Sequence, residues 1–297
     1  MIQVERLTKH FGNFAALDDL TLTVPKGAIY GLVGPNGAGK STVIRHITGA
    51  LRPESGRVLV DQQPVYENPA VKERMACIPD DIFYYQSAGL RDMMKFYAGI
   101  YRRFDQGMYE KLHKAFELDE KLPIRRYSKG MQKQAAFLLA ICQRPDVMIL
   151  DEPVDGLDPV MRRQVWSLIM QDVAENGTTV LVSSHNLREL EDVCDHVGIM
   201  HRGKMILQRS LSELQDNVVK VQAVFQEGTQ PPQELNVLHR SNSGRIQTLI
   251  TRGSQEEINR ILAAVNPVFF DMVPLTLEEI FIYELGGMDY DVKSIIL

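Results

Sequence analysis

The stretch that decides the fold is Gly34-Pro35-Asn36-Gly37-Ala38-Gly39-Lys40-Ser41-Thr42. It matches the pattern G-x-x-x-x-G-K-[ST], in which glycines let the backbone curl so that successive N–H groups point inward around a phosphate. In that pattern Lys40 reaches phosphate oxygens and Ser41 offers its hydroxyl to Mg²⁺. A helix that begins at Ser41 would also direct the positive end of its dipole at the same group. The stretch therefore predicts a nucleotide phosphate site.

The segments on both sides of this stretch support the prediction. Residues 28–33 form an apolar run typical of a buried strand, and Val43, Ile44 and Ile47 give an apolar stripe at helical spacing. The alternative is a chance glycine-rich turn, which does not explain why a strand precedes the loop and a helix follows it.

Two further apolar strands end in polar residues. Residues 147–150 are followed by Asp151 and Glu152, and residues 179–182 are followed by Ser183, Ser184 and His185. Continuous apolar strands are typical of a parallel sheet that is covered on both faces, and ligands bind at the carboxyl ends of such strands. Asp151 is then placed to hold Mg²⁺ through water and Glu152 to polarise an attacking water. Two solvated loop acids are the alternative for the carboxylates, and a structural role is the alternative for His185.

Composition limits the class of protein. The chain has 297 residues, of which 44% are hydrophobic and 24% charged, and its formal net charge is −5. An acidic balance argues against a nucleic-acid binder, so we expect no nucleic acid as a partner. The cysteines Cys77, Cys142 and Cys194 have no metal-like spacing, which favours reduced thiols. Neither a signal peptide nor an apolar run close to 18 residues is found, so we expect no membrane span.

The remaining segments indicate the domain organisation. Residues 1–24 alternate like antiparallel strands, with a turn at residues 11–14, where Phe11 is either core or a stacking platform for a base. Met, Leu and aromatic residues at helical spacing predict a helical subdomain at about 88–145. From residue 216 to 297 an alternating pattern and two capping boxes, at Ser254 and Thr276, predict a small α+β domain.

A short segment makes the family resemblance specific. Tyr127-Ser128-Lys129-Gly130-Met131 resembles Leu-Ser-Gly-Gly-Gln, the signature sequence of the ATP-binding cassette family, with Ser128 and Gly130 retained. Residues 154–158 resemble the D-loop of that family, and His185 resembles its switch histidine. The similarity runs through about residues 1–210. It implies an α/β fold: a P-loop NTPase (RecA-like) core with an N-terminal antiparallel β subdomain and a helical subdomain, in residues 1–215.

The resemblance also implies a function. Members of the family dimerise around two ATP molecules and hydrolyse them to drive a separate transmembrane permease at the cytoplasmic face of the cell membrane. By this resemblance Phe11 stacks on adenine, Lys40 and Mg²⁺ hold the phosphates, Glu152 is the general base, and His185 orients the reacting groups. Ser128 and Gly130 would bind the γ-phosphate of ATP on the second cassette. The sequence from Thr276 resembles the ending of ATPase subunits from drug, peptide and antibiotic-resistance exporters, which favours an exporter.

Three positions outside the signature segment depart from the family pattern. Asp80 stands where the family has a glutamine; it can still bind Mg²⁺ but cannot donate a hydrogen bond when ionised. Val154 and Asp155 stand where threonine and serine are usual in the D-loop. Together with Ser41 and Asp151, Asp80 completes the set of side chains that we expect as Mg²⁺ ligands. A soluble or regulatory cassette ATPase without a permease remains the alternative function.

Overall fold

The computed structural model describes residues 1–226, 231–273 and 275–285. The chain divides into two compact units. The first comprises Met1–His185 and Val193–Gln208, and the second comprises Asn186–Asp192 and Arg209–Leu297. Within the described residues, no helix combines the length and the apolar character needed to cross a bilayer. The three cysteines are free thiols, as their spacing predicted.

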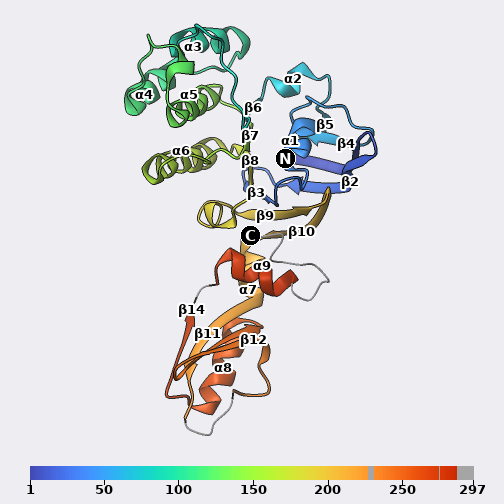
Figure 1. Cartoon of the computed structure of the whole chain (residues 1–297), viewed down its shortest axis with the longest axis vertical. Coiled ribbons are helices and arrows are strands. Elements are labelled where there is room, and N and C mark those ends of the chain that lie inside the picture. The colour runs from blue at the N-terminus through green and yellow to red at the C-terminus, as the bar shows by residue number, and fades with distance from the viewer. Residues whose placement is uncertain (227–230, 274, 286–297) are drawn as a thin grey trace. The chain divides into compact units, whose positions relative to one another are not determined.

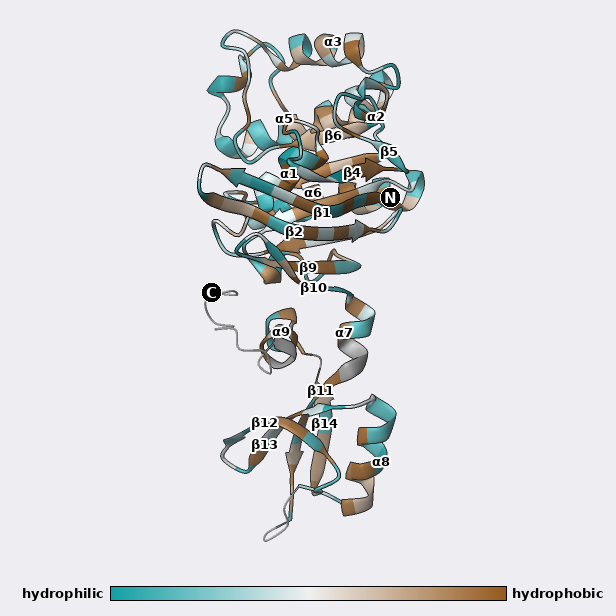
Figure 2. Ribbon diagram, turned by 90° about the vertical axis from the view of Figure 1, so that its right-hand side faces the viewer, coloured by the Kyte–Doolittle hydropathy of each residue, from teal (hydrophilic) through white to brown (hydrophobic). Residues whose placement is uncertain are grey.

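The first unit opens with an antiparallel sheet whose strand order is β2-β1-β4-β5. Its strands are β1 (Ile2–Phe11), β2 (Phe14–Val24), β4 (Ser55–Val60) and β5 (Gln63–Pro64). Ile2 and Val4 are fully buried, so the predicted alternation has one face in the core. Figure 2 shows hydrophobic and hydrophilic bands along β1 and β2. Gly12, with φ of 61°, lies in the predicted turn between these strands.

The central sheet of this unit has six strands in the order β10-β9-β3-β8-β7-β6. They are β3 (Ile29–Val33), β6 (Met75–Ile78), β7 (Val147–Asp151), β8 (Thr179–Ser184), β9 (His196–His201) and β10 (Lys204–Ser210). The pairs β6–β7, β7–β8, β8–β3 and β3–β9 are parallel. Every residue of β3, β7 and β8 is buried, which confirms that these apolar runs are central strands. Their carboxyl ends therefore meet at one edge of the sheet.

Helices cover both faces of the central sheet. Helix α1 (Lys40–Ile47) lies with the antiparallel sheet on one side, and α6 (Pro159–Asn176) lies on the other side together with α5 (Figure 1). One hydrophobic core joins the antiparallel sheet, α1 and strands β3, β7 and β8. This layered arrangement is the predicted α/β P-loop fold.

The predicted helical insertion contains α3 (Leu90–Ile100), α4 (Gln106–Phe116), the 3-10 turn η1 (Ile124–Arg126) and α5 (Lys129–Cys142). Asp105 caps α4 and Ser128 caps α5, each by accepting a backbone N–H from its own first turn. From Gln134 onward α5 is buried except at Ala136. This helix therefore connects the insertion with the central sheet, while its first residues stay accessible.

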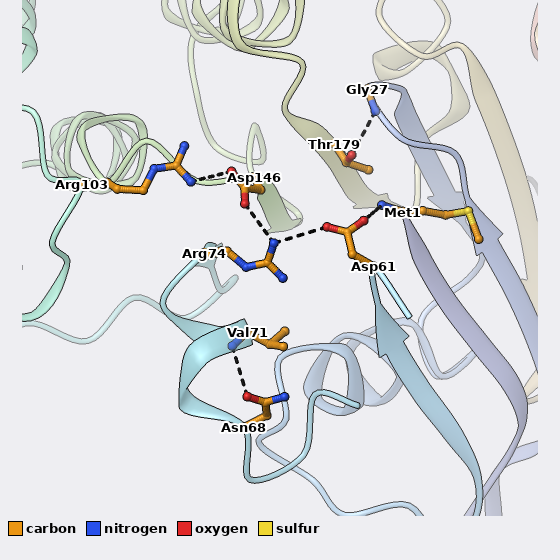
Figure 3. Close-up of polar contacts among 9 residues, drawn as sticks. All are labelled: Met1, Gly27, Asp61, Asn68, Val71, Arg74, Arg103, Asp146 and Thr179. Atoms are coloured by element: carbon orange, nitrogen blue, oxygen red, sulfur yellow. Dashed lines mark hydrogen bonds and ion pairs between the residues drawn. The ribbon is translucent and has the colours of Figure 1, made fainter. Parts of the chain in front are cut away.

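An ionic network ties this insertion to the sheet at the edge where β6 and β7 begin (Figure 3). Arg74 Nη1 lies 3.5 Å from Asp61 Oδ2 and 3.3 Å from Asp146 Oδ2. Arg103, from the loop after α3, donates to Asp146 Oδ1 at 2.6 Å. The α-amino group of Met1 donates to Asp61 Oδ1 at 2.8 Å and lowers the pKa of that carboxyl. Beside the network in Figure 3, Asn68 caps the short helix α2 (Pro69–Lys72).

The second unit is built on an antiparallel sheet of order β12-β13-β11-β14. Its elements are η2 (Leu187–Glu189), α7 (Leu211–Asn217), β11 (Val218–Val224), β12 (Asn236–Ser243), β13 (Ile246–Arg252), α8 (Gln255–Val265), β14 (Phe269–Val273) and α9 (Leu277–Leu285). Ile258 and Leu262 of α8 pack on Val221 and Leu249 of the sheet. Ser254 and Thr276 cap α8 and α9 as predicted.

The observed boundary of this unit differs from the division at residues 215 and 216 predicted from the sequence. The unit takes in α7 and also the segment Asn186–Asp192. The segment belongs there because Arg188 pairs with Glu278 at 2.8 Å and the backbone N–H of Leu277 donates to Glu191. Residues 286–297 of the predicted domain lie outside the described residues.

Candidate functional site

The loop between β3 and α1 adopts a curled backbone that needs its glycines. Gly37 and Gly39 have φ of 82° and 106°, in the left-handed region that glycine tolerates. A Cβ atom on Gly39 would lie 2.8 Å from the carbonyl oxygen of Ala16, and one on Gly34 would lie 2.4 Å from that of Met200. Helix α1 begins directly after Gly39, so its unpaired N–H groups face the loop.

Lys40 is buried at the base of this loop, with 6% of its side chain exposed. Its ammonium donates to the carbonyl oxygen of Gly34 at 2.6 Å and lies 3.4 Å from Oε1 of Glu152. A buried cation needs such partners, because an isolated charge is costly to remove from water.

The two carboxylates after β7 have different environments. Asp151 is buried, and its Oδ1 accepts a short hydrogen bond from Ser183 Oγ. Glu152 has φ of 47°, which is uncommon for a residue other than glycine, and its backbone N–H donates to the same Ser183 Oγ at 3.0 Å. Ser183 at the end of β8 therefore connects both acids, a role that its position alone did not reveal.

His185 completes the group of side chains at this edge. Its Nδ1 lies 2.9 Å from Oε2 of Glu152, and about half of its side chain is exposed. The carboxylate of Glu152 thus contacts Lys40 through one oxygen and His185 through the other. Lys40, which follows β3, and His185, which follows β8, therefore converge on the carboxylate of Glu152, which follows β7.

A cavity of about 300 Å³ opens above the loop. Its lining includes Phe11, Phe14, Ala16, Pro35, Asn36, Gly37, Ala38, Gly39, Lys40, Ser41, Thr42, Asp80 and Glu152. The rings of Phe11 and Phe14 are 50% and 63% exposed, and Lys9 Nζ lies 5.5 Å from the centroid of the Phe11 ring. Phe14 was missed by the sequence reasoning, although its place across the turn from Phe11 indicates the same surface.

Asp80 lies on the wall of this cavity, in the loop after β6. Desolvation raises the pKa of its carboxyl, and the nearby carboxylates of Asp151, Glu152 and Asp155 raise it further, while the ammonium of Lys133 opposes them. Within the described part of the chain, no three His, Cys, Asp or Glu side chains form a group that could hold a metal ion alone.

The predicted signature residues lie elsewhere. Ser128 is exposed at the start of α5, where its Oγ accepts the N–H of Met131 at 3.2 Å. A Cβ atom on Gly130 would make only ordinary contacts, the nearest at 3.7 Å from Leu157. Neither residue lines the cavity around Lys40. The structure therefore brings together Phe11, the phosphate loop, Asp80, Asp151, Glu152 and His185, but not Ser128 and Gly130.

Comparison with known proteins agrees with this geometry. A family model described as "ABC transporter" matches residues 17–155. The ABC transporter ATP-binding protein YtrB of Bacillus subtilis is 31% identical over 97% of this chain and 99% of its own length. The chain belongs to the family of ABC transporter ATP-binding proteins. The resemblance identified from the signature segment is thereby confirmed, and the chain is an ATP-hydrolysing subunit of this family.

Other members of the ABC transporter family show how far the likeness extends. The bacitracin transport ATP-binding protein BcrA of Bacillus licheniformis is 28% identical, over 97% of this chain and 98% of its own length. A solved structure of the ATP-binding subunit of an ABC transporter superposes with a TM-score of 0.67 at 27% identity, covering 72% of this chain and 92% of that one. The alignment with YtrB spans 288 residues and therefore extends into both units of this chain.

Proposed function

We propose that this chain binds Mg²⁺ and ATP in the cavity above its phosphate loop, pairs with a second cassette, and drives a separate permease that exports its cargo. The observation that carries this proposal is the position of the Glu152 carboxylate. It contacts Lys40 of the phosphate loop at 3.4 Å and His185 at 2.9 Å, at the edge where three parallel strands end.

The cavity fits a nucleotide in its shape and its donor groups. The glycine backbone leaves room that side chains would fill, and the start of α1 supplies N–H groups for phosphate oxygens. Phosphate oxygens would replace the carbonyl of Gly34 and the carboxylate of Glu152 as partners of the Lys40 ammonium. The exposed ring of Phe11 gives an adenine a stacking surface at the rim of the cavity.

Oxygen donors near the loop suit Mg²⁺. Ser41 and Asp80 line the cavity, and Asp151, the residue before Glu152, is buried. Mg²⁺ in phosphate sites commonly takes one or two protein ligands and completes its shell with waters and phosphates, so a three-carboxylate group is not needed. When bound, the ion would neutralise charge on the transferred phosphoryl group.

Hydrolysis needs a base that receives a proton from the attacking water. Glu152 lies in the cavity wall beside Lys40, and its Oε1 becomes available to a water once Lys40 binds phosphate, so we assign it this role. His185 holds the other oxygen of the carboxylate and so limits its rotation. Lys40 stabilises charge that develops on the phosphate oxygens.

The position of the signature segment supports a dimeric site. Ser128 and Gly130 are accessible at the N-terminus of α5 and lie outside the cavity of their own chain. A helix N-terminus with a serine hydroxyl suits an anion. We assign these two residues to the γ-phosphate of ATP bound by the second cassette.

Exposed aromatic side chains mark the surface that we assign to the permease. Phe83, Tyr85 and Phe96 are 77%, 56% and 48% exposed. Their ring centroids lie 5.9 Å apart in the pair Phe83–Tyr85 and 6.2 Å apart in the pair Tyr85–Phe96. A contiguous aromatic patch is typical of a protein interface. Docking here would hold the chain at the cytoplasmic face of the cell membrane, and the resemblance of the sequence from Thr276 to exporter ATPase subunits favours an exporter.

The test is to purify the chain from detergent-solubilised membranes of its native host and identify its partners. We expect a stoichiometric multi-span membrane protein. A triple variant, Phe83→Ser with Tyr85→Ser and Phe96→Ser, should lose that partner while its ATP binding stays unchanged. Recovery of ribosomal proteins, of nucleic acid or of no membrane protein would contradict the permease and favour a soluble or regulatory ATPase.

A further inference from the structure

Lys133 contacts the loop that carries Glu152 without lying on the cavity that holds Lys40. It belongs to the first turns of α5, and its ammonium donates to the carbonyl oxygen of Glu152 at 2.9 Å and to that of Asp155 at 2.7 Å. Both acceptors are backbone atoms of the loop between β7 and α6. A single cation on α5 therefore binds this loop at two points.

The backbone of Glu152 needs such support. Its φ of 47° lies in a region that residues other than glycine populate sparsely, and such conformations persist only where surrounding contacts determine them. Ser183 Oγ accepts the N–H of Glu152 from the side of β8, and Lys133 binds its carbonyl from the side of α5. The peptide groups on either side of this Cα atom are thus held by two different elements.

The direction of the Glu152 side chain follows from that backbone. With the peptide groups fixed, the carboxylate projects toward Lys40 and His185, which it contacts at 3.4 Å and 2.9 Å. A change of φ would move the Cβ atom, and the carboxylate with it, relative to the N–H that Ser183 holds. Lys133 also lines a second cavity, of about 340 Å³, together with Asp80 and Asp155.

We propose that Lys133 is a positioning residue whose ammonium fixes the backbone of Glu152 and Asp155 and so aims the Glu152 carboxylate for hydrolysis. Ser128 caps the N-terminus of α5, the helix that carries Lys133. The two hydrogen bonds of the Lys133 ammonium therefore connect this helix to the loop of Glu152. The inference rests on the proposed role of Glu152. It does not depend on which cargo or permease the chain serves.

The experiment compares Lys133→Met and Lys133→Arg with the unchanged full-length chain. Lys111→Met is the matched control, because Lys111 is exposed on α4 and the substitution is the same. Steady-state hydrolysis gives kcat and KM, and calorimetric titration gives the Kd for Mg²⁺–ATP. We expect Lys133→Met to lower kcat by about 10²-fold, the scale of a misplaced catalytic group, with the Kd for ATP unchanged. Lys133→Arg should restore most of kcat, and Lys111→Met should change nothing.

Hydrogen–deuterium exchange supplies a readout that does not require turnover. In Lys133→Met the amides of residues 152 and 154–156 should exchange faster (Pro153 has no amide hydrogen), while those of α5 stay protected as in the wild-type chain. An unchanged kcat in Lys133→Met would overturn the inference. So would a variant that loses ATP binding and also loses amide protection throughout α5, because Lys133 would then support the fold in general. If the wild-type chain itself fails to bind or hydrolyse ATP, the proposed function is wrong. In that case the role of Lys133 is still tested by exchange: equal exchange of the amides of residues 152 and 154–156 in Lys133→Met and in the wild-type chain would overturn it.

Discussion

His185 Nδ1 lies 2.9 Å from Oε2 of Glu152, although 33 residues separate the two in the chain. The contact exists because β7 and β8 are adjacent parallel strands, so the residues that follow them emerge at the same edge of the sheet. The other oxygen of the carboxylate faces Lys40, which follows β3 on the far side of β8. The sheet order thus brings a base, a histidine and a phosphate-binding lysine together.

Replacing Glu152 with glutamine should stop hydrolysis without preventing ATP binding. The amide has nearly the shape of the carboxylate but cannot accept a proton from water, and loss of a general base lowers rates by about 10²–10⁴-fold. We expect Glu152→Gln to accumulate as an ATP-bound dimer, measured by light scattering on a sizing column. Glu175→Gln, on the exposed side of α6, is the control for the loss of one charge. A Glu152→Gln variant that stays monomeric with ATP would count against the shared site.

Asp80 should make the folded chain less stable at neutral pH than at mildly acidic pH. Desolvation, together with the carboxylates around it, raises the pKa of Asp80 in the folded state. For an acid, a raised folded pKa means that the ionised form opposes folding above that pKa, and that this effect vanishes below the ordinary pKa of aspartate. Asp80→Asn should therefore raise Tm at pH 7 by about 1–2 °C, the scale of a surface substitution.

The measurement is a series of melting curves from neutral pH down to below the ordinary aspartate pKa. The gain from Asp80→Asn should shrink as the pH falls, and Asp81→Asn serves as the control for removing one negative charge from the same loop. A gain that stays constant with pH would show that the carboxyl of Asp80 titrates as in the unfolded chain.

The sequence predicts the parts of this site that local pattern determines. The glycines before Lys40 and the apolar runs of β3, β7 and β8 mark the loop, the buried strands and their common edge. Contacts that depend on how distant loops meet were not predictable. Lys133 is one charged residue among many on a helix, and its bonds to the carbonyls of residues 152 and 155 depend on how α5 packs. The assignment of residues 186–192 to the second unit likewise depends on a tertiary contact, between Arg188 and Glu278.

Tyr30 and Gly198 should show coupled effects on stability. The Tyr30 hydroxyl is buried and, within the described part of the chain, has no hydrogen-bond partner, and burial raises its pKa. A Cβ atom on Gly198 would lie 2.2 Å from that hydroxyl oxygen. Gly198→Ala should therefore destabilise the fold by about 1–3 kcal/mol through overpacking, whereas Tyr30→Phe should be neutral or stabilising because it removes an unpaired polar group.

Urea unfolding of both single variants and the double variant measures the coupling. Removing the hydroxyl makes room for the new methyl group, so Tyr30→Phe should recover part of the stability that Gly198→Ala loses. Val197→Ala, at the adjacent buried position of β9, is a control that the loss of the hydroxyl should not rescue. Strictly additive effects of Tyr30→Phe and Gly198→Ala would contradict the predicted contact.

The ionic network before β6 and β7 should respond unequally to the loss of its two arginines. Arg103 is 54% exposed and contacts one carboxylate, so Arg103→Met should cost at most about 1 kcal/mol, as exposed ion pairs do. Arg74 lies between Asp61 and Asp146, and Arg74→Met leaves these two acids without the cation they share. We expect it to cost roughly 1–2 kcal/mol. Both costs should shrink at about 1 M salt, where the screening length falls to ~3 Å. Urea unfolding at low and high salt gives the four values. Equal costs for the two variants, or costs that salt does not change, would mean that packing by the arginine stems, rather than charge, ties the helical insertion to the sheet.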